Sequence, residues 1–191
     1  EQVKKSQLIF LNEMGLDPGI DHMSAMQMLH RLKKQGANIL EFKSYCGGLI
    51  APESDTNAWH YKFTWNPRNV VLAGQGLPAQ YLQNGEIKYV PYTQLFKRTE
   101  SFSLQSGNFE GYVNRDSLAY QKLYGLESVK TFVRGTLRYA GFCSAWDVFV
   151  QLGLTDHSLI IENSEQLTAF DFINRFLSGN PTDDIIERIE A

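Results

Sequence analysis

The order of apolar and polar positions predicts a strand, a loop and a helix at the start of the chain. Residues 8–11 form a short apolar run between polar neighbours, which is typical of a strand. The proline and glycines within residues 15–19 predict a turn. Between residues 22 and 35 apolar side chains recur at helical spacing, with Asp21 as the predicted N-cap and Gly36 as the stop.

Strand patterns continue after this helix. Residues 38–45 roughly alternate apolar and polar side chains and lead into residues 46–48 (Cys-Gly-Gly). Loops at strand ends are common places for sites in α/β proteins. The aromatic alternation of residues 59–65 predicts another strand. Residues 66–67 (Asn-Pro) then predict the start of a helix, with the asparagine as N-cap and the proline at the first helical position.

The middle of the chain is predicted to be rich in strands. The Asn-Gly pair at residues 84–85 suits a type I′ turn in a hairpin that spans residues 80–90. Residues 102–104 and 131–139 predict two more strands, and a helix near residues 116–123 is expected between them.

The last third of the chain is predicted to be helical, because from residue 144 onward its apolar residues are spaced for buried helix faces. The whole pattern predicts an α/β (α+β) fold: a mixed, largely antiparallel sheet covered by helices, with a helical C-terminal appendage. We assign residues 1–155 to the α/β domain and residues 156–191 to the appendage of the same domain.

Composition and charge exclude several classes of protein. The 191 residues are 43% hydrophobic, enough to fill a sizeable core, so a globular protein is expected. Lys and Arg number 18 against 21 acidic residues, and the net charge of −3 gives no general attraction to nucleic acid or anionic membranes. The longest apolar runs have strand length, so we expect neither a membrane span nor a signal peptide.

The cysteines and histidines give no metal or disulfide signature. Cys46 and Cys143 lie far apart and outside any C-x-x-C spacing, and the four histidines are scattered. A reducing cytoplasm is the compartment that this usage predicts. The chain starts without Met, which suggests a piece of a longer polypeptide.

Four motifs together resemble the saccharopine dehydrogenase (glutamate-forming) family, also called saccharopine reductase. They are GLDPGIDH at residues 15–22, SYCGGLIAPE at residues 44–53, YKFTWNPR at residues 61–68 and YVNRDS at residues 112–117. The likeness covers most of residues 6–155, and four motifs in order are far more specific than any one of them.

The resemblance implies an oxidoreductase of lysine metabolism, linked to NADP or NAD, that interconverts saccharopine with aminoadipate semialdehyde and glutamate. It implies a substrate-binding and dimerisation domain similar in fold to the C-terminal domain of glyceraldehyde-3-phosphate dehydrogenase. The sequence lacks a G-x-G-x-x-G fingerprint followed by an acidic residue about 20 positions later, so the dinucleotide-binding domain is absent from this chain. We therefore expect no cofactor here, no turnover by this chain alone and a homodimer, and we assign no catalytic residue.

The resemblance singles out Arg68, because an arginine at this motif position binds a substrate carboxylate in the family. A guanidinium can hold a carboxylate in a bidentate fork. The structural alternative is a surface arginine at a helix start. Gly19 and Asp21 lie where backbone N–H groups at the start of a helix could receive a second carboxylate, or where an ordinary turn could meet a capped helix. Asp21 and His22 suggest either acid–base chemistry or capping.

The remaining candidates are Gly47, Gly48 and Arg115. The two glycines would let the loop approach a substrate closely. Cys46 is interpreted as a small packed residue, since hydride transfer to an imine needs no thiolate. Arg115 is either a second anion contact or a partner in a structural ion pair.

Two other functions remain open. One is a related dehydrogenase that acts on a carboxynorspermidine-type substrate. The other is a non-catalytic module that binds amino acids or a partner and keeps the fold without redox chemistry. A preceding glycine-rich strand–loop–helix would favour an enzyme.

Overall fold

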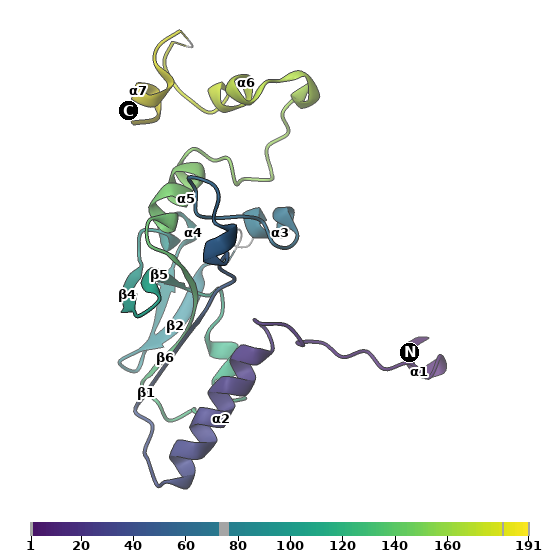
Figure 1. Cartoon of the computed structure of the whole chain (residues 1–191), viewed down its shortest axis with the longest axis vertical. Coiled ribbons are helices and arrows are strands. Elements are labelled where there is room, and N and C mark those ends of the chain that lie inside the picture. Colours follow the sequence, from purple (N-terminus) through teal and green to yellow (C-terminus); the bar gives the residue numbers. More distant parts are fainter. Residues whose placement is uncertain (1, 73–76, 181, 191) are drawn as a thin grey trace.

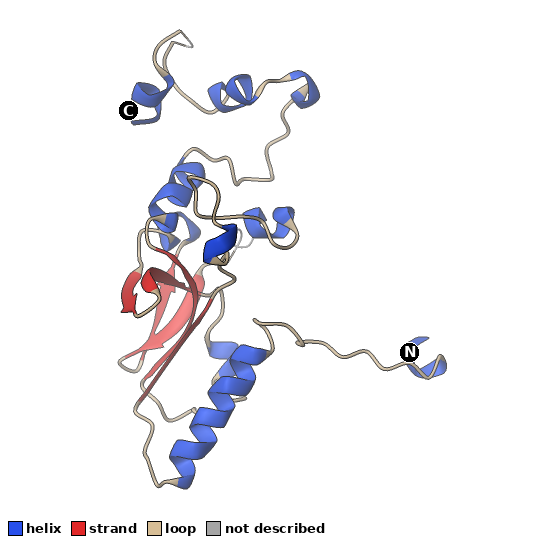
Figure 2. Cartoon of the chain, viewed as in Figure 1, coloured by secondary structure: helices blue, strands red, loops and turns tan. Residues whose placement is uncertain are grey.

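Six strands form one mixed sheet in this computed structural model, which describes residues 2–72, 77–180 and 182–190 (Figures 1 and 2). The strand order is β3-β2-β6-β5-β4, and β1 pairs with β6 in parallel while the other pairs are antiparallel. The mixed, largely antiparallel sheet is thereby confirmed. The strands are β1 Glu41–Cys46, β2 Ala79–Gln83, β3 Glu86–Val90, β4 Glu100–Leu104, β5 Gly107–Val113 and β6 Thr131–Tyr139.

The longest helix, α2, lies beside the sheet, whereas α6 and α7 lie beyond α5 and away from it (Figure 1). The helical C-terminal part is therefore seen as an appendage to the sheet. The α-helices are α1 Gln2–Lys5, α2 Ile20–Lys34, α3 Pro67–Leu72, α4 Tyr92–Leu95, α5 Phe142–Gln151, α6 Ala169–Asn174 and α7 Ile185–Glu190. Short 3-10 turns span η1 Pro52–Ser54, η2 Leu118–Tyr120 and η3 Ser164–Gln166.

Helix α2 confirms the prediction for residues 22–35 to within two residues at its start. Gly36 follows the helix with φ 80°, and its N–H donates to the carbonyl of Lys33 while the N–H of Ala37 donates to that of Leu32. These two bonds form the glycine-terminated helix end that the sequence predicts. The N-cap is Gly19, so the prediction that Asp21 is the N-cap is wrong: Asp21 lies in the first turn of the helix.

Two clusters of buried residues form the core in the described part of the chain. Under α2, Leu29 packs with residues that precede β6 and with Phe132, which is fully buried. Around α4 and α5, Val90 and Cys143 belong to a second buried cluster. Because strand β6 contributes to the first cluster and its residue Arg138 approaches the aromatic residues of α5, this strand links both parts of the interior.

Two predicted strands are absent and one was missed. Residues 8–11 pair with no strand among the described residues, and all four side chains are exposed. Residues 59–65 form a loop whose Tyr61 packs against Phe142 of α5 instead of entering the sheet. The sequence reading also missed β5, and the helix expected near residues 116–123 is only the 3-10 turn η2. Alternating apolar and polar residues indicate a segment with one apolar and one polar face. A strand also needs a neighbouring strand whose backbone N–H and C=O groups are free to pair with it.

The predicted hairpin is confirmed. Strands β2 and β3 pair in antiparallel register around Asn84 and Gly85, whose φ angles are 52° and 83°. Positive φ at both central residues is the property of a type I′ turn, which explains the Asn-Gly sequence. Asn66 also caps α3 as predicted, since its side-chain oxygen accepts the N–H of Asn69 at 3.4 Å.

Candidate functional site

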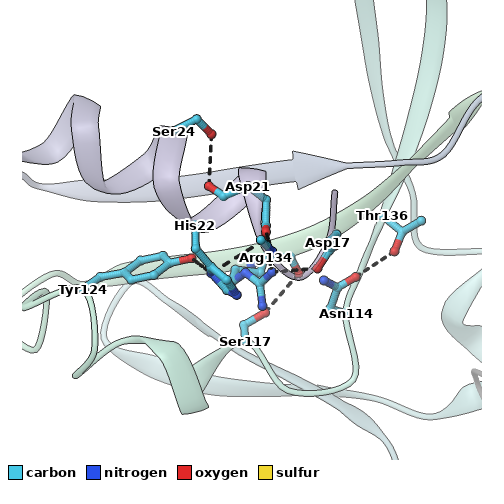
Figure 3. A network of polar contacts seen from close by, with 10 residues as sticks. Asp17, Asp21, His22, Ser24, Asn114, Ser117, Tyr124, Arg134 and Thr136 are labelled. Carbon is cyan, nitrogen blue, oxygen red and sulfur yellow. Dashed lines mark hydrogen bonds and ion pairs between the residues drawn. The ribbon is translucent and has the colours of Figure 1, made fainter. Parts of the chain in front are cut away.

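Two carboxylates meet one arginine between the loop before α2 and strand β6 (Figure 3). Nη2 of Arg134 lies 2.5 Å from Oδ2 of Asp21 and 3.1 Å from Oδ1 of Asp17. The side chains of Arg134 and Asp21 are 6% and 4% exposed. A buried charge is tolerated only when it is paired and hydrogen-bonded, so this network fixes the loop against the sheet.

The loop between the two aspartates allows no side chain at Gly19. Gly19 has φ 149°, and a Cβ there would lie 2.2 Å from the carbonyl oxygen of Gly15. The N–H of Gly19 donates to Oδ1 of Asp21 at 2.8 Å. This N–H, one of those considered for a substrate carboxylate, is therefore engaged by a carboxylate of the protein itself.

The turn after β5 is tied to the backbone of Arg134. The fully buried Ser117 accepts the N–H of Arg134 at 2.9 Å, and its hydroxyl donates to the Arg134 carbonyl at 3.1 Å. Asn114 donates its N–H to the same carbonyl at 2.8 Å, and its side-chain oxygen accepts the hydroxyl of Thr136 at 2.8 Å. Asn114 and Ser117 of the YVNRDS motif are thus explained by contacts to β6.

His22 has structural contacts of its own. Its Nδ1 lies 2.5 Å from the hydroxyl of Tyr124, and its ring stacks on Tyr120 with centroids 4.8 Å apart. The guanidinium of Arg134 lies 4.1 Å from the centre of the same Tyr120 ring. These contacts favour the structural alternative for Asp21 and His22 over acid–base chemistry.

Burial disfavours the charged forms of three groups in or beside the network, Asp17, Tyr124 and Cys46. Burial, and then the negative charge of Asp21, raise the pKa of Asp17. Burial raises the pKa of Tyr124 to about 12. The pKa of the Cys46 thiol is raised by burial first and then by the charges of Asp17 and Asp21. A nucleophilic cysteine needs a lowered pKa. The raised pKa of Cys46 therefore supports its interpretation as a small packed residue.

A cavity of about 180 Å³ lies further along β6, on the side of the strand that carries Arg134. Arg138 of β6 lines this cavity. It lies on the same face of the strand as Arg134, because alternate residues of a strand share a face. The Arg138 guanidinium lies 4.9 Å from the ring centre of Phe142, and its Nη1 donates to the carbonyl of Gly48 at 3.3 Å. Arg115 also lines the cavity, and its Nη2 lies 3.5 Å from the carbonyl of Leu72.

The structure places three of the six predicted residues at the network or at the cavity. Gly19 and Asp21 belong to the network around Arg134, whereas Arg115 lines the cavity. Arg68 is exposed on α3 and is not a lining residue, but Trp65 and Val70 on either side of it are.

The glycine pair after β1 serves two different purposes. A Cβ at Gly47 would lie 2.0 Å from the carbonyl oxygen of Leu137. The missing side chain therefore lets the loop after β1 lie against the backbone of β6. A Cβ at Gly48 would meet nothing within 4 Å, and Gly48 contributes its carbonyl to Arg138. We predicted that these glycines let the loop lie close to a substrate. In the structure, Gly47 lies close to the protein's own backbone.

The arginines of β6 were not among the residues predicted from the sequence. The strand reads TFVRGTLRY, and its period of two places Arg134, Thr136 and Arg138 on one face. Polar residues repeated at that period on an otherwise apolar strand were the available signal. Asp17 was not predicted as a functional residue either, although it lies in the GLDPGIDH motif at residues 15–22.

Within the described ranges, no three His, Cys, Asp or Glu residues gather closely enough to hold a metal ion. None of the helices in these ranges is long and apolar enough to cross a membrane.

The sheet, the clamped loop and the cavity that two arginines line define an α/β domain. A family model described as the saccharopine dehydrogenase C-terminal domain matches residues 15–186. The chain belongs to this family.

Similar proteins of known name support the assignment. The chain is 42% identical over 156 residues to the mitochondrial alpha-aminoadipic semialdehyde synthase of Mus musculus, covering 81% of this chain and 17% of that protein. It is 33% identical over 193 residues to the saccharopine dehydrogenase [NADP(+), L-glutamate-forming] of Saccharomyces cerevisiae, covering 100% of this chain and 43% of that protein. The chain thus spans less than half the length of either relative.

A solved structure shares the fold. The apo saccharopine dehydrogenase (L-Glu forming) from Saccharomyces cerevisiae superposes with a TM-score of 0.68 at 38% sequence identity. The match covers 80% of this chain and 34% of that one.

Proposed function

We propose that this chain is the substrate-binding domain of an oxidoreductase of lysine metabolism that interconverts saccharopine with aminoadipate semialdehyde and glutamate. The observation that carries the proposal is the family match over residues 15–186, joined to a cavity that two arginines line. Saccharopine has three carboxylates, so a substrate domain for it needs cationic anchors. Residues 1–155 would bind the substrate, and residues 156–191 would be the helical appendage.

The domain would contribute to catalysis by positioning. A nicotinamide cofactor, NADP or NAD, would supply the hydride, and we expect other parts of the full-length protein to hold it. Among the described residues we find no glycine-rich strand–loop–helix that could cradle its pyrophosphate. This chain would fix the dicarboxylic amine in one orientation, and it would be inactive on its own.

Arg68 would bind a substrate carboxylate at the rim of the cavity. It is exposed on α3, and its side chain makes no hydrogen bond or ion pair with the described part of the chain. Trp65 and Val70, which line the cavity, lie on either side of it in sequence. A guanidinium held by nothing else in this part of the protein can turn toward a ligand that projects from the cavity.

Replacing Arg68 with alanine in the full-length protein should therefore weaken saccharopine binding by about 1.5–3 kcal/mol, the loss expected for a charged hydrogen bond. Steady-state kinetics with saccharopine and nucleotide, together with calorimetry, would measure the effect. Arg68→Lys should rescue only part of it, because an ammonium cannot form the fork. Arg31→Ala, at an exposed arginine of α2, is the matched control.

Three results of that experiment would contradict the proposal or redirect it. Unchanged binding in Arg68→Ala would remove Arg68 from the site. Binding of saccharopine without turnover by the full-length wild type would favour the non-catalytic module. Turnover of a carboxynorspermidine-type substrate in preference to saccharopine would favour the related dehydrogenase.

The face of the sheet that carries Tyr45 would form a homodimer interface. A shallow cavity of about 230 Å³ on this face is lined by strand and loop residues alone within the described ranges. Leu104, 56% exposed, shares the face with Phe102, and β4 is an edge strand of the sheet. A second copy of the chain would bury these groups.

Leu104→Asp should therefore convert the dimer to a monomer in sedimentation velocity runs on the full-length protein. A carboxylate that is buried beside Phe102 in the interface would be left without a partner. Leu123→Asp, at a leucine that is 71% exposed elsewhere, should leave the dimer intact. A monomeric wild type, or a dimeric Leu104→Asp variant, would contradict this interface.

A reducing cytoplasm remains our prediction for the compartment. Cys46 and Cys143 are both free thiols in the structure, as a reducing environment would require. Fractionation of cells that carry the tagged full-length protein would test it, and recovery with mitochondria would contradict it.

A further inference from the structure

The described residues that line the cavity beside Arg138 supply cationic and neutral polar groups. Among the described residues that line it, no Asp or Glu occurs. Its polar lining consists of Tyr92, Tyr112, Asn114, Arg115, Thr136 and Arg138. The rest is apolar or aromatic, including Val90 and Phe96. A pocket with positive charge, hydroxyl groups and apolar walls matches an anionic group carried on an apolar stem.

Two of the lining residues carry a polar atom that is buried without a partner in the described part of the chain. These atoms are the hydroxyl oxygen of Tyr92 and Nε of Arg138. Buried polar groups in native proteins are nearly always hydrogen-bonded, so each calls for a partner. The cavity volume of about 180 Å³ far exceeds the space that one water molecule needs.

Arg138 is held in place by other contacts. Its guanidinium lies over the rings of Phe142 and Tyr61, at 4.9 Å and 5.4 Å from their centres. Its Nη1 donates to the carbonyl of Gly48 at 3.3 Å. The contacts fix the guanidinium and leave Nε unused, which is the state of a preorganised donor.

We propose that this cavity binds one carboxylate-bearing arm of the substrate, with Nε of Arg138 and the hydroxyl of Tyr92 as donors to the carboxylate. The inference rests on the proposed function and adds residues that the sequence did not indicate. Val90 and Phe96 would pack on the methylene groups of the arm. Arg68, at the rim, would meet a different carboxylate of the same molecule.

Tyr92→Phe is the sharpest test, because it removes one hydroxyl that has no partner in the described fold. In the full-length protein we expect its KM for saccharopine to rise about tenfold, with kcat little changed, as for a contact made equally before and during the reaction. Its melting temperature without ligand should match that of the wild type. Tyr89→Phe, at a tyrosine of the preceding strand β3 that is 57% exposed, should leave KM unchanged.

Calorimetry with glutarate, a simple dicarboxylate, separates this inference from the proposed function. We expect Tyr92→Phe and Arg138→Met to bind both glutarate and saccharopine more weakly than the wild type. Wild-type affinities for both ligands in Tyr92→Phe would overturn the carboxylate site while leaving the proposed function standing. A wild type that binds neither ligand would overturn both. Tyr92→Phe decides the matter even if Arg138→Met fails to fold.

Discussion

Replacing Arg134 with leucine should lower the free energy of unfolding of the chain by about 3–5 kcal/mol, the usual cost of removing one partner from a buried ion pair. Asp21, whose side chain is 4% exposed, would lose the guanidinium that pairs with it. Among the described residues, His22 alone would remain close, with its Nδ1 3.7 Å from Oδ2 of Asp21. Asp17 would lose its ion pair as well. Urea unfolding followed by circular dichroism and by tryptophan fluorescence would measure the change.

Matched variants separate the buried network from ordinary surface charge. Lys88→Met breaks the pair with Glu86, whose side chain is 73% exposed, and should leave the stability nearly unchanged because solvent screens this pair. Combining Arg134→Leu with Asp21→Leu should recover part of the loss, because an apolar pair leaves no unpaired charge at Asp21. A loss of under about 1 kcal/mol in Arg134→Leu would show that the network does not hold the loop.

The network also bears on the proposed site, although it is not expected to touch the substrate. Arg134 and Arg138 are four residues apart on one face of β6, and the turn after β5 that is tied to Arg134 also supplies Asn114 and Arg115 to the cavity lining. A shift of β6 against this turn would therefore move the cavity wall. Side chains that bind a ligand tolerate little displacement, so stability and binding are coupled here.

Local rules explain which elements could be predicted. The glycine stop of α2 and the Asn-Gly turn of the β2–β3 hairpin depend only on neighbouring residues, and both predictions were confirmed. Residues 8–11 and 59–65 have equally suggestive patterns but no strand partner in the described structure. Pairing is a long-range property, and apolar alternation does not supply it.

The site was only partly predictable for the same reason. Sequence spacing and the family resemblance indicated Gly19, Asp21 and Arg115, which the structure places at the network or the cavity. Nothing local indicates that Asp21 pairs with Arg134, which lies 113 residues away in sequence. The two glycines at residues 47–48 look alike in sequence, yet only one of them is confined by the backbone of β6.

This difference leads to the second large effect: Gly47→Ala should destabilise the chain by about 3 kcal/mol or more, beyond the usual cost of overpacking. The new Cβ would lie 2.0 Å from the carbonyl oxygen and 2.9 Å from the carbonyl carbon of Leu137, and both atoms belong to the backbone of β6. Neither can yield as a flexible side chain would, so the loop must separate from the strand.

Gly48→Ala is the control one residue away. Its Cβ would meet nothing within 4 Å, so we expect stability to stay unchanged or to rise by up to about 1 kcal/mol through the smaller entropy of the unfolded chain. Urea unfolding of both variants tests the contrast, and equal stabilities would contradict it. Saccharopine kinetics of the full-length Gly48→Ala variant then test the second role proposed for this loop: a raised KM at unchanged stability would mean that the loop lies against the substrate, because the fold itself tolerates the methyl group.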